Sequence, residues 1–280
     1  MKLLRFGDTG TEKTGIIDNE GNIRDLSSVI DDIDGSTISA DGLNKLSVLD
    51  ILSLPKVENN PRIGPCVGNV GKFLCIGLNY SDHAAETGAE APPEPILFHK
   101  ATSAIIGPND DVEIPKTSSA TDWEVELGII IGKKAKYITE GSSQDYIAGY
   151  CVVNDVSERD FQAKRAGQWT KGKSCDTFGP IGPYLVTKDE VKDPQNLTMT
   201  LDVNGQRMQI GSTKTLIFSV NHIVYYLSQF MSLNPGDVIA TGTPPGVGLG
   251  MKPPVFLKSG DVMKLSIEGL GEQTQKCIQA

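Results

Sequence analysis

The sequence lacks the cysteine pattern of a disulfide framework or of a structural zinc site. It contains five cysteines, an odd number, and no two of them form a Cys-x-x-Cys pair. Disulfide-rich secreted domains and zinc modules depend on paired cysteines at characteristic spacings. We therefore expect reduced, unpaired thiols, as is usual in the cytoplasm.

Positive charge and long apolar runs are also scarce. The chain has 26 lysine and arginine residues against 35 aspartate and glutamate residues, which gives a net charge of −9. A surface of that sign repels nucleic-acid phosphates. No apolar run is long enough to cross a bilayer, and the N-terminus lacks the apolar segment of a signal peptide. The sequence predicts a cytoplasmic protein with neither a nucleic-acid nor a membrane partner.

Glycine and proline are plentiful, with 30 and 16 residues in a chain of 280. This composition favours many turns and short strands over a helical bundle. The length suits one large domain with a small companion. We predict an α+β, strand-rich protein with a small N-terminal α/β domain over residues 1–70 and a larger domain over residues 71–280.

Two glutamates alternate with apolar residues in residues 121–132, a pattern that predicts a strand entering a buried sheet. Glu124 and Glu126 would then share one face, roughly 7 Å apart, while Val125 and Leu127 face the core. Such carboxylates repel each other unless a hard cation lies between them. The alternative is that both glutamates lie on the solvent-exposed face of an edge strand.

A third carboxylate, Asp155, stands at the polar end of a second buried strand, residues 146–155. Functional residues often lie where a rigid sheet meets a loop. Asp155 is therefore the candidate that would complete a divalent-cation site with Glu124 and Glu126.

A short helix is predicted after this strand. Ser157, with Asp160 three residues later, resembles a capping box. Arg159 and Gln162 would lie on one face of that helix, since they are three residues apart.

Three further residues are candidate contacts for an anionic ligand. Lys100 ends an apolar strand and points either into the site or along the surface. Lys173 lies in an irregular, Gly- and Pro-rich stretch, residues 169–183, where a constrained lysine can hold an oxyanion. Thr243, at the end of a strand, could bond a ligand carboxylate.

His83 and Glu86 are the candidate acid–base pair. They fall three residues apart on a short predicted helix, so their side chains would meet on one face. A carboxylate beside a histidine fixes the tautomer and stabilises the imidazolium, which suits activation of water. The alternative is a surface ion pair.

Taken together, these motifs resemble the fumarylacetoacetate hydrolase superfamily over about residues 70–280. The motifs, in chain order, are Asn79-Tyr80 with His83 and Glu86, then Trp123-Glu124-Val125-Glu126-Leu127, then Asn154-Asp155 with Arg159 and Gln162, then Gly172-Lys173-Ser174, then residues 241–248 (TGTPPGVG). The resemblance implies a mixed β-roll with few helices and a homodimer.

The resemblance also implies a role for each candidate residue. Glu124, Glu126 and Asp155 match ligands of Mg²⁺ or Mn²⁺, and His83 and Glu86 match a water-activating dyad. Lys173 matches a lysine that stabilises developing negative charge. The positions that match substrate contacts are Arg159, Gln162 and Thr243.

The implied reaction is hydrolysis of a carbon–carbon bond of a 2,4-dioxo acid, which gives pyruvate and a second acid. The pattern of residues 167–177 is most similar to 2,4-diketo-3-deoxy sugar-acid hydrolases of L-fuconate or L-rhamnonate catabolism. Relatives of this subgroup also carry the name ureidoglycolate lyase, an activity that yields glyoxylate and urea. Decarboxylation and keto–enol isomerisation are further chemistries of the same site, and the motifs do not choose among them.

Overall fold

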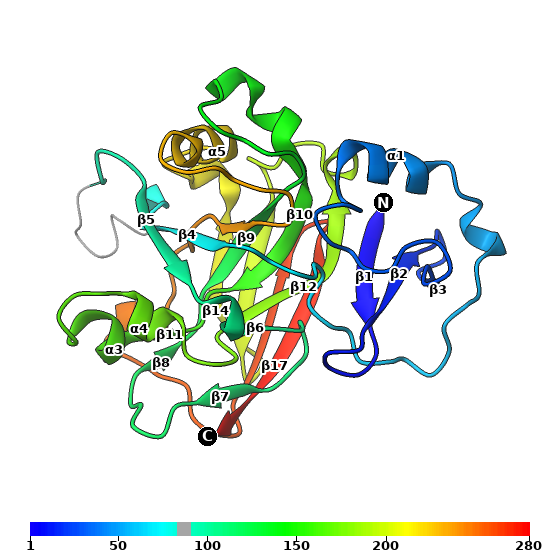
Figure 1. Ribbon diagram of the computed structural model, residues 1–280. Helices are drawn as coiled ribbons and strands as arrows, with labels where there is room; N and C mark the ends of the chain where they lie inside the picture. Colours follow the sequence, from blue (N-terminus) through cyan, green and yellow to red (C-terminus); the bar gives the residue numbers. More distant parts are fainter. Residues whose placement is uncertain (83–90) are drawn as a thin grey trace.

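The computed structural model describes residues 1–82 and 91–280 and is rich in strands with few helices (Figure 1). Within those residues the largest sheet has ten strands. In spatial order they are β3 (Ile23–Asp25), β2 (Lys13–Ile17), β1 (Lys2–Phe6), β12 (Gly179–Thr187), β10 (Ile147–Asn154), β9 (Val125–Ile131), β15 (Val238–Ala240), β4 (Phe73–Gly77) and β5 (Ile96–Lys100), with β6 (Ile105–Ile106) beside β12. The predicted strand-rich α+β fold is confirmed.

A second sheet packs against this one. Its strands are β14 (Gln206–Ser212), β13 (Thr198–Val203), β16 (Val262–Ile267), β17 (Gly271–Gln279) and β7 (Val112–Ile114), while β8 (Thr121–Asp122) pairs with β11 (Ser157–Glu158). The α-helices of the described residues are α1 (Ala40–Ser47), α3 (Arg159–Ala163), α4 (Thr170–Lys173) and α5 (Val220–Ser228). Short 3₁₀ turns are η1 (Ile51–Ser53), η2 (Thr102–Ala104), η3 (Glu140–Tyr146), η4 (Lys188–Glu190), η5 (Thr213–Thr215) and η6 (Gly248–Gly250).

Strand β9 is the centre of the fold, because it lies between β10 and β15 and all seven of its residues are buried. Val125 and Leu127 face the core shared with the second sheet and α5, as predicted. Ile130 belongs to the core on the opposite face. Both faces are therefore covered, and the alternative of a solvent-exposed edge strand is wrong.

The N-terminal strands extend the large sheet, since β1 pairs antiparallel with β12 (Figure 1). Leu3 and Ile16 pack in the same core as Ile130 and Ile181. The first 70 residues thus share a sheet and a core with the rest of the chain, and the domain boundary at residue 70 stays a prediction.

Two other expectations can be compared with the structure. All five cysteines are free thiols, as predicted. Across residues 1–82 and 91–280, no helix combines the length and the apolar character that crossing a membrane requires. The β13–β14 hairpin turns at Asn204 and Gly205, both with positive φ, as a two-residue type I′ turn requires.

Gly246 is the glycine whose replacement should be most informative about the second sheet. Its φ is +101°, and an added Cβ would lie 2.0 Å from the Met208 carbonyl oxygen on β14. We expect Gly246→Ala to destabilise the protein by about 2 kcal/mol or more, measured by urea unfolding. The control is Gly205→Ala, at φ +78° with nothing within 4 Å of the added Cβ. It should lose only about 1 kcal/mol, and equal losses would contradict the steric argument.

Candidate active site

Three carboxylates from separate segments lie together beside a cavity of about 390 Å³. Glu126 lies on β9, Glu124 just before it, and Asp155 just after β10. One oxygen of each lies within 4.8 Å of the other two, and all three side chains are buried. Glu124 and Glu126 line the cavity, while Asp155 is fully buried. The structure thus brings the three residues together, and their role as metal ligands stays a prediction.

Glu124 lies between two strands and not within one. The prediction of one continuous strand over residues 121–132 is wrong, because β8 ends at Asp122 and β9 begins at Val125. The Glu124 N–H donates to the Asn154 side chain at 3.2 Å, and its carbonyl accepts from the Asp155 N–H at 2.9 Å. These bonds hold Glu124 next to Asp155.

Buried cations hold two of the carboxylates. Lys173 Nζ donates to Glu124 Oε2 and to Asp155 Oδ2, both at 2.7 Å. Lys100 Nζ lies 2.5 Å from Asp155 Oδ1, and Arg159 Nη2 lies 2.7 Å from Glu124 Oε1. Burial acts to lower the pKa of Lys173, but Asp155 and Glu124 outweigh it and raise that pKa. Lys173 therefore remains an ammonium and acts as a cationic donor.

None of these three cations forms an ion pair with Glu126. Burial, with Asp155 and Glu124 nearby, raises the pKa of Glu126 well above its usual range. For Glu124, burial also acts to raise the pKa, but Lys173 and Arg159 prevail and lower it to about 2. A divalent cation would stabilise the Glu126 carboxylate, and a set of buried carboxylate oxygens suits Mg²⁺ or Mn²⁺.

Arg159 and Gln162 line the cavity from α3, and Arg159 Nη1 donates to Gln162 Oε1 at 3.2 Å. The helix does not begin as predicted, however. Its N-cap is Glu158, whose carboxylate accepts from the Phe161 N–H, whereas the Ser157 hydroxyl donates to the Asp155 carbonyl. The predicted capping box is wrong because Ser157 lies in β11, where it pairs with Asp122 of β8, and its hydroxyl bonds the Asp155 carbonyl.

The side chains of Lys100 and Thr243, predicted to contact a ligand, both bond groups of the protein instead. Lys100 is buried, bonds Asp155 and the Val156 carbonyl, and is not among the residues that line this cavity. Thr243 lines the cavity, but its hydroxyl donates to the Val125 carbonyl at 2.9 Å. Their roles in substrate binding stay predictions.

His83 and Glu86 lie outside the described residues. The structure therefore leaves their role as a water-activating pair a prediction.

Two features of the site had no clear signal in the sequence. Lys173 ends a four-residue helix, α4, within the stretch predicted to be irregular. Trp169, just before this helix, packs edge-on against Phe98, with the ring centroids 5.2 Å apart. Asp122 accepts from Arg159 Nε at 2.8 Å and from the Gly248 N–H at 2.7 Å. Asp122 thereby joins the start of α3 to the loop around Gly248. In the sequence, only its position beside Trp123-Glu124 hints at this role.

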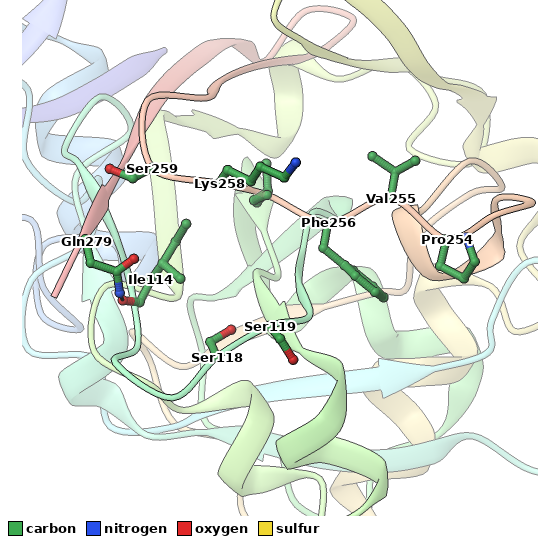
Figure 2. Close-up of a pocket in the computed structure, with 10 residues that line it drawn as sticks. Ile114, Ser118, Ser119, Pro254, Val255, Phe256, Lys258, Ser259 and Gln279 are labelled. Atoms are coloured by element: carbon green, nitrogen blue, oxygen red, sulfur yellow. Dashed lines mark hydrogen bonds between the residues drawn. The ribbon is translucent and has the colours of Figure 1, made fainter.

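A second cavity, of about 530 Å³, lies between residues 254–259 and Ser118 and Ser119 (Figure 2). Its lining among the described residues contains a single charged side chain, Lys258, and neither a carboxylate nor a histidine. It thus offers no acid–base pair and no set of metal ligands.

Known proteins resemble the chain over its whole length. Residues 72–278 match the profile described as fumarylacetoacetate (FAA) hydrolase C-terminal. A protein of Burkholderia orbicola, provisionally named a hydrolase, is 60% identical over 281 aligned positions that cover 100% of both chains. The solved fumarylacetoacetate hydrolase of psychrophilic Exiguobacterium antarcticum has a TM-score of 0.89 and 36% identity, again over 100% of both chains.

A third match is the maleylpyruvate hydrolase of Sphingobium sp. SYK-6, solved in complex with manganese(II) ion and pyruvate. It has a TM-score of 0.83 and 28% identity over 100% of both chains. These likenesses confirm the fold that the sequence motifs implied. None of the three proteins bears the name of the sugar-acid subgroup, which stays a prediction.

Proposed function

Because the chain belongs to the fumarylacetoacetate hydrolase family, we propose that it is a divalent-cation-dependent hydrolase of 2,4-dioxo acids that releases pyruvate. The observation that carries the proposal is the buried triad of Glu124, Glu126 and Asp155 with Lys173 bonded to two of its members. The triad is suited to a hard cation, and the lysine adds a fixed positive charge beside the cavity.

We assign the cation, Mg²⁺ or Mn²⁺, to these three carboxylates, which leave coordination positions for a substrate. When bound, such a cation supplies Lewis-acid polarisation of carboxylate and oxo oxygens. The manganese and pyruvate in the Sphingobium enzyme support this assignment.

The chain's own residues would act as follows. His83, oriented by Glu86, takes a proton from a water that attacks the 4-carbonyl carbon. Lys173 has three N–H groups, of which two bond carboxylates among the described residues, and the third could donate to the oxyanion that forms at that carbon. The oxyanion then re-forms the C4 carbonyl as the C3–C4 bond breaks, which releases the second acid. The electron pair of that bond goes to C3, which takes the proton that His83 removed from water and so gives pyruvate.

We also propose a cytoplasmic homodimer, with a 2,4-diketo-3-deoxy sugar acid as the substrate. A polyhydroxy tail needs hydrogen-bond partners, and Arg159 and Gln162 are cavity side chains that can supply them. The remainder of the lining includes apolar side chains such as Leu78, Trp169 and Leu249, which suit a less polar tail. Substrates of both kinds therefore belong in the test.

The test is pyruvate release from 2,4-dioxo acids with polyhydroxy and with apolar tails, and urea release from ureidoglycolate in parallel. We expect pyruvate, loss of turnover on chelation with the fold retained by circular dichroism, and recovery with Mn²⁺ or Mg²⁺. Urea without pyruvate would instead establish the lyase. Unfolding on chelation would indicate a structural cation.

A further inference from the structure

Val125, between Glu124 and Glu126, is bonded by side chains at both its N–H and its carbonyl. The Val125 N–H donates to Gln209 Oε1 at 3.0 Å. The Val125 carbonyl accepts from the Thr243 hydroxyl at 2.9 Å. Any shift of Val125 would therefore move both glutamates relative to Asp155.

Gln209 occupies an unusual position in the second sheet. It is the one buried residue of β14, whose other six residues are exposed or half-buried. A buried amide is unfavourable unless its polar atoms are bonded, and an apolar side chain would fill the same position without that requirement. Gln209 meets the requirement fully, because Nε2 donates to Thr243 Oγ1 at 2.9 Å and to the Pro244 carbonyl at 2.8 Å.

These bonds form a closed ring of three residues. Gln209 accepts from Val125 and donates to Thr243, and Thr243 donates back to Val125. The Thr243 hydroxyl has a single proton, and it donates that proton in a hydrogen bond to the Val125 carbonyl. It therefore cannot also donate to a ligand carboxylate while the ring is closed. The ring thus gives Thr243 a role in the protein framework.

We propose that Gln209 is a positioning residue for the cation site, holding Glu124 and Glu126 in register through Val125 and Thr243. The inference rests on the proposed function and extends it, since Gln209 does not itself line the cavity and reaches the site through Val125 and Thr243. Its effect is transmitted from β14, a strand of the second sheet, to the site on the first.

The test is a double-mutant cycle on Mn²⁺ affinity, measured by isothermal titration calorimetry of the whole chain. Gln209→Met removes the three bonds of the amide with little change in volume, and Thr243→Val removes the hydroxyl. Each change should weaken Mn²⁺ binding about 10-fold or more, as loss of groups that orient metal ligands commonly does. Because both open the same ring, the double variant should lose much less affinity than the product of the single losses.

A matched control is Gln229→Met, which removes an amide that donates to the Ile138 and Tyr225 carbonyls. It should lower the melting temperature and leave Mn²⁺ affinity unchanged. Gln209 and Thr243 variants that melt lower but bind Mn²⁺ as the parent does, or losses that simply multiply, would overturn the positioning role. Absence of Mn²⁺ binding by the parent protein would instead refute the proposed function itself, and the positioning role with it.

Discussion

Replacing Lys173 by methionine is expected to lower kcat at least about 100-fold, the usual loss when a donor to a developing oxyanion is removed. Methionine keeps most of the volume of the side chain but removes the ammonium that bonds Glu124 and Asp155. Since a nearby positive charge repels a cation, Mn²⁺ should bind the variant at least as tightly as it binds the parent. Steady-state pyruvate release and calorimetry would measure the two effects separately.

The control for this variant is Lys171→Met on the same short helix. Lys171 is exposed and bonds the Arg165 carbonyl, so its loss should leave kcat unchanged. A Lys173→Met protein with Mn²⁺ bound and kcat within a few fold of the parent would show that the ammonium stabilises no charge in the reaction.

Replacing Glu126 by glutamine should weaken Mn²⁺ binding by more than about 100-fold, beyond the range seen for residues that only orient ligands. The amide oxygen can still accept from the Gly242 N–H, as the carboxylate does at 2.8 Å, so the local structure has little reason to change. Without a cation the variant should melt no lower than the parent, because removing a negative charge relieves its repulsion by Asp155 and Glu124.

Glu158→Gln is the control for this variant, and the opposite changes in melting temperature and Mn²⁺ affinity are expected of it. Glu158 is equally buried, but its carboxylate accepts from the Ala120 N–H just before β8 and from the Phe161 N–H in α3. Its replacement should lower the melting temperature and spare Mn²⁺ affinity. If Glu126→Gln behaved in the same way, Glu126 would be a structural residue and the cation would have to lie elsewhere.

Local sequence patterns were sufficient for the parts of the site that regular structure creates. The apolar runs of β9 and β10 predict buried strands, and their antiparallel pairing places Val125 opposite Asn154. That register brings Asp155 next to Glu124, although they are 31 positions apart in the chain. The assignment of roles came from the resemblance of several motifs in order, since each carboxylate alone has a simple surface alternative.

The remaining features depend on contacts between distant residues, which local patterns do not record. The break at Trp123-Glu124 is fixed by Asn154 and Asp155, not by the alternation that favoured one long strand. The short helix α4 follows Trp169, which packs on Phe98 from another part of the chain. Gln209 has the same difficulty, because its partners lie on β9 and in the loop after β15.

Both tryptophans of the chain lie near the carboxylate triad. Trp123 precedes Glu124 and donates from its indole to the Gly246 carbonyl, while Trp169 lines the cavity. Tryptophan fluorescence therefore reports on the neighbourhood of the triad. Binding of a paramagnetic ion or a coloured oxo acid there should quench that emission. Occupancy of the site can thus be followed by fluorescence without an attached dye.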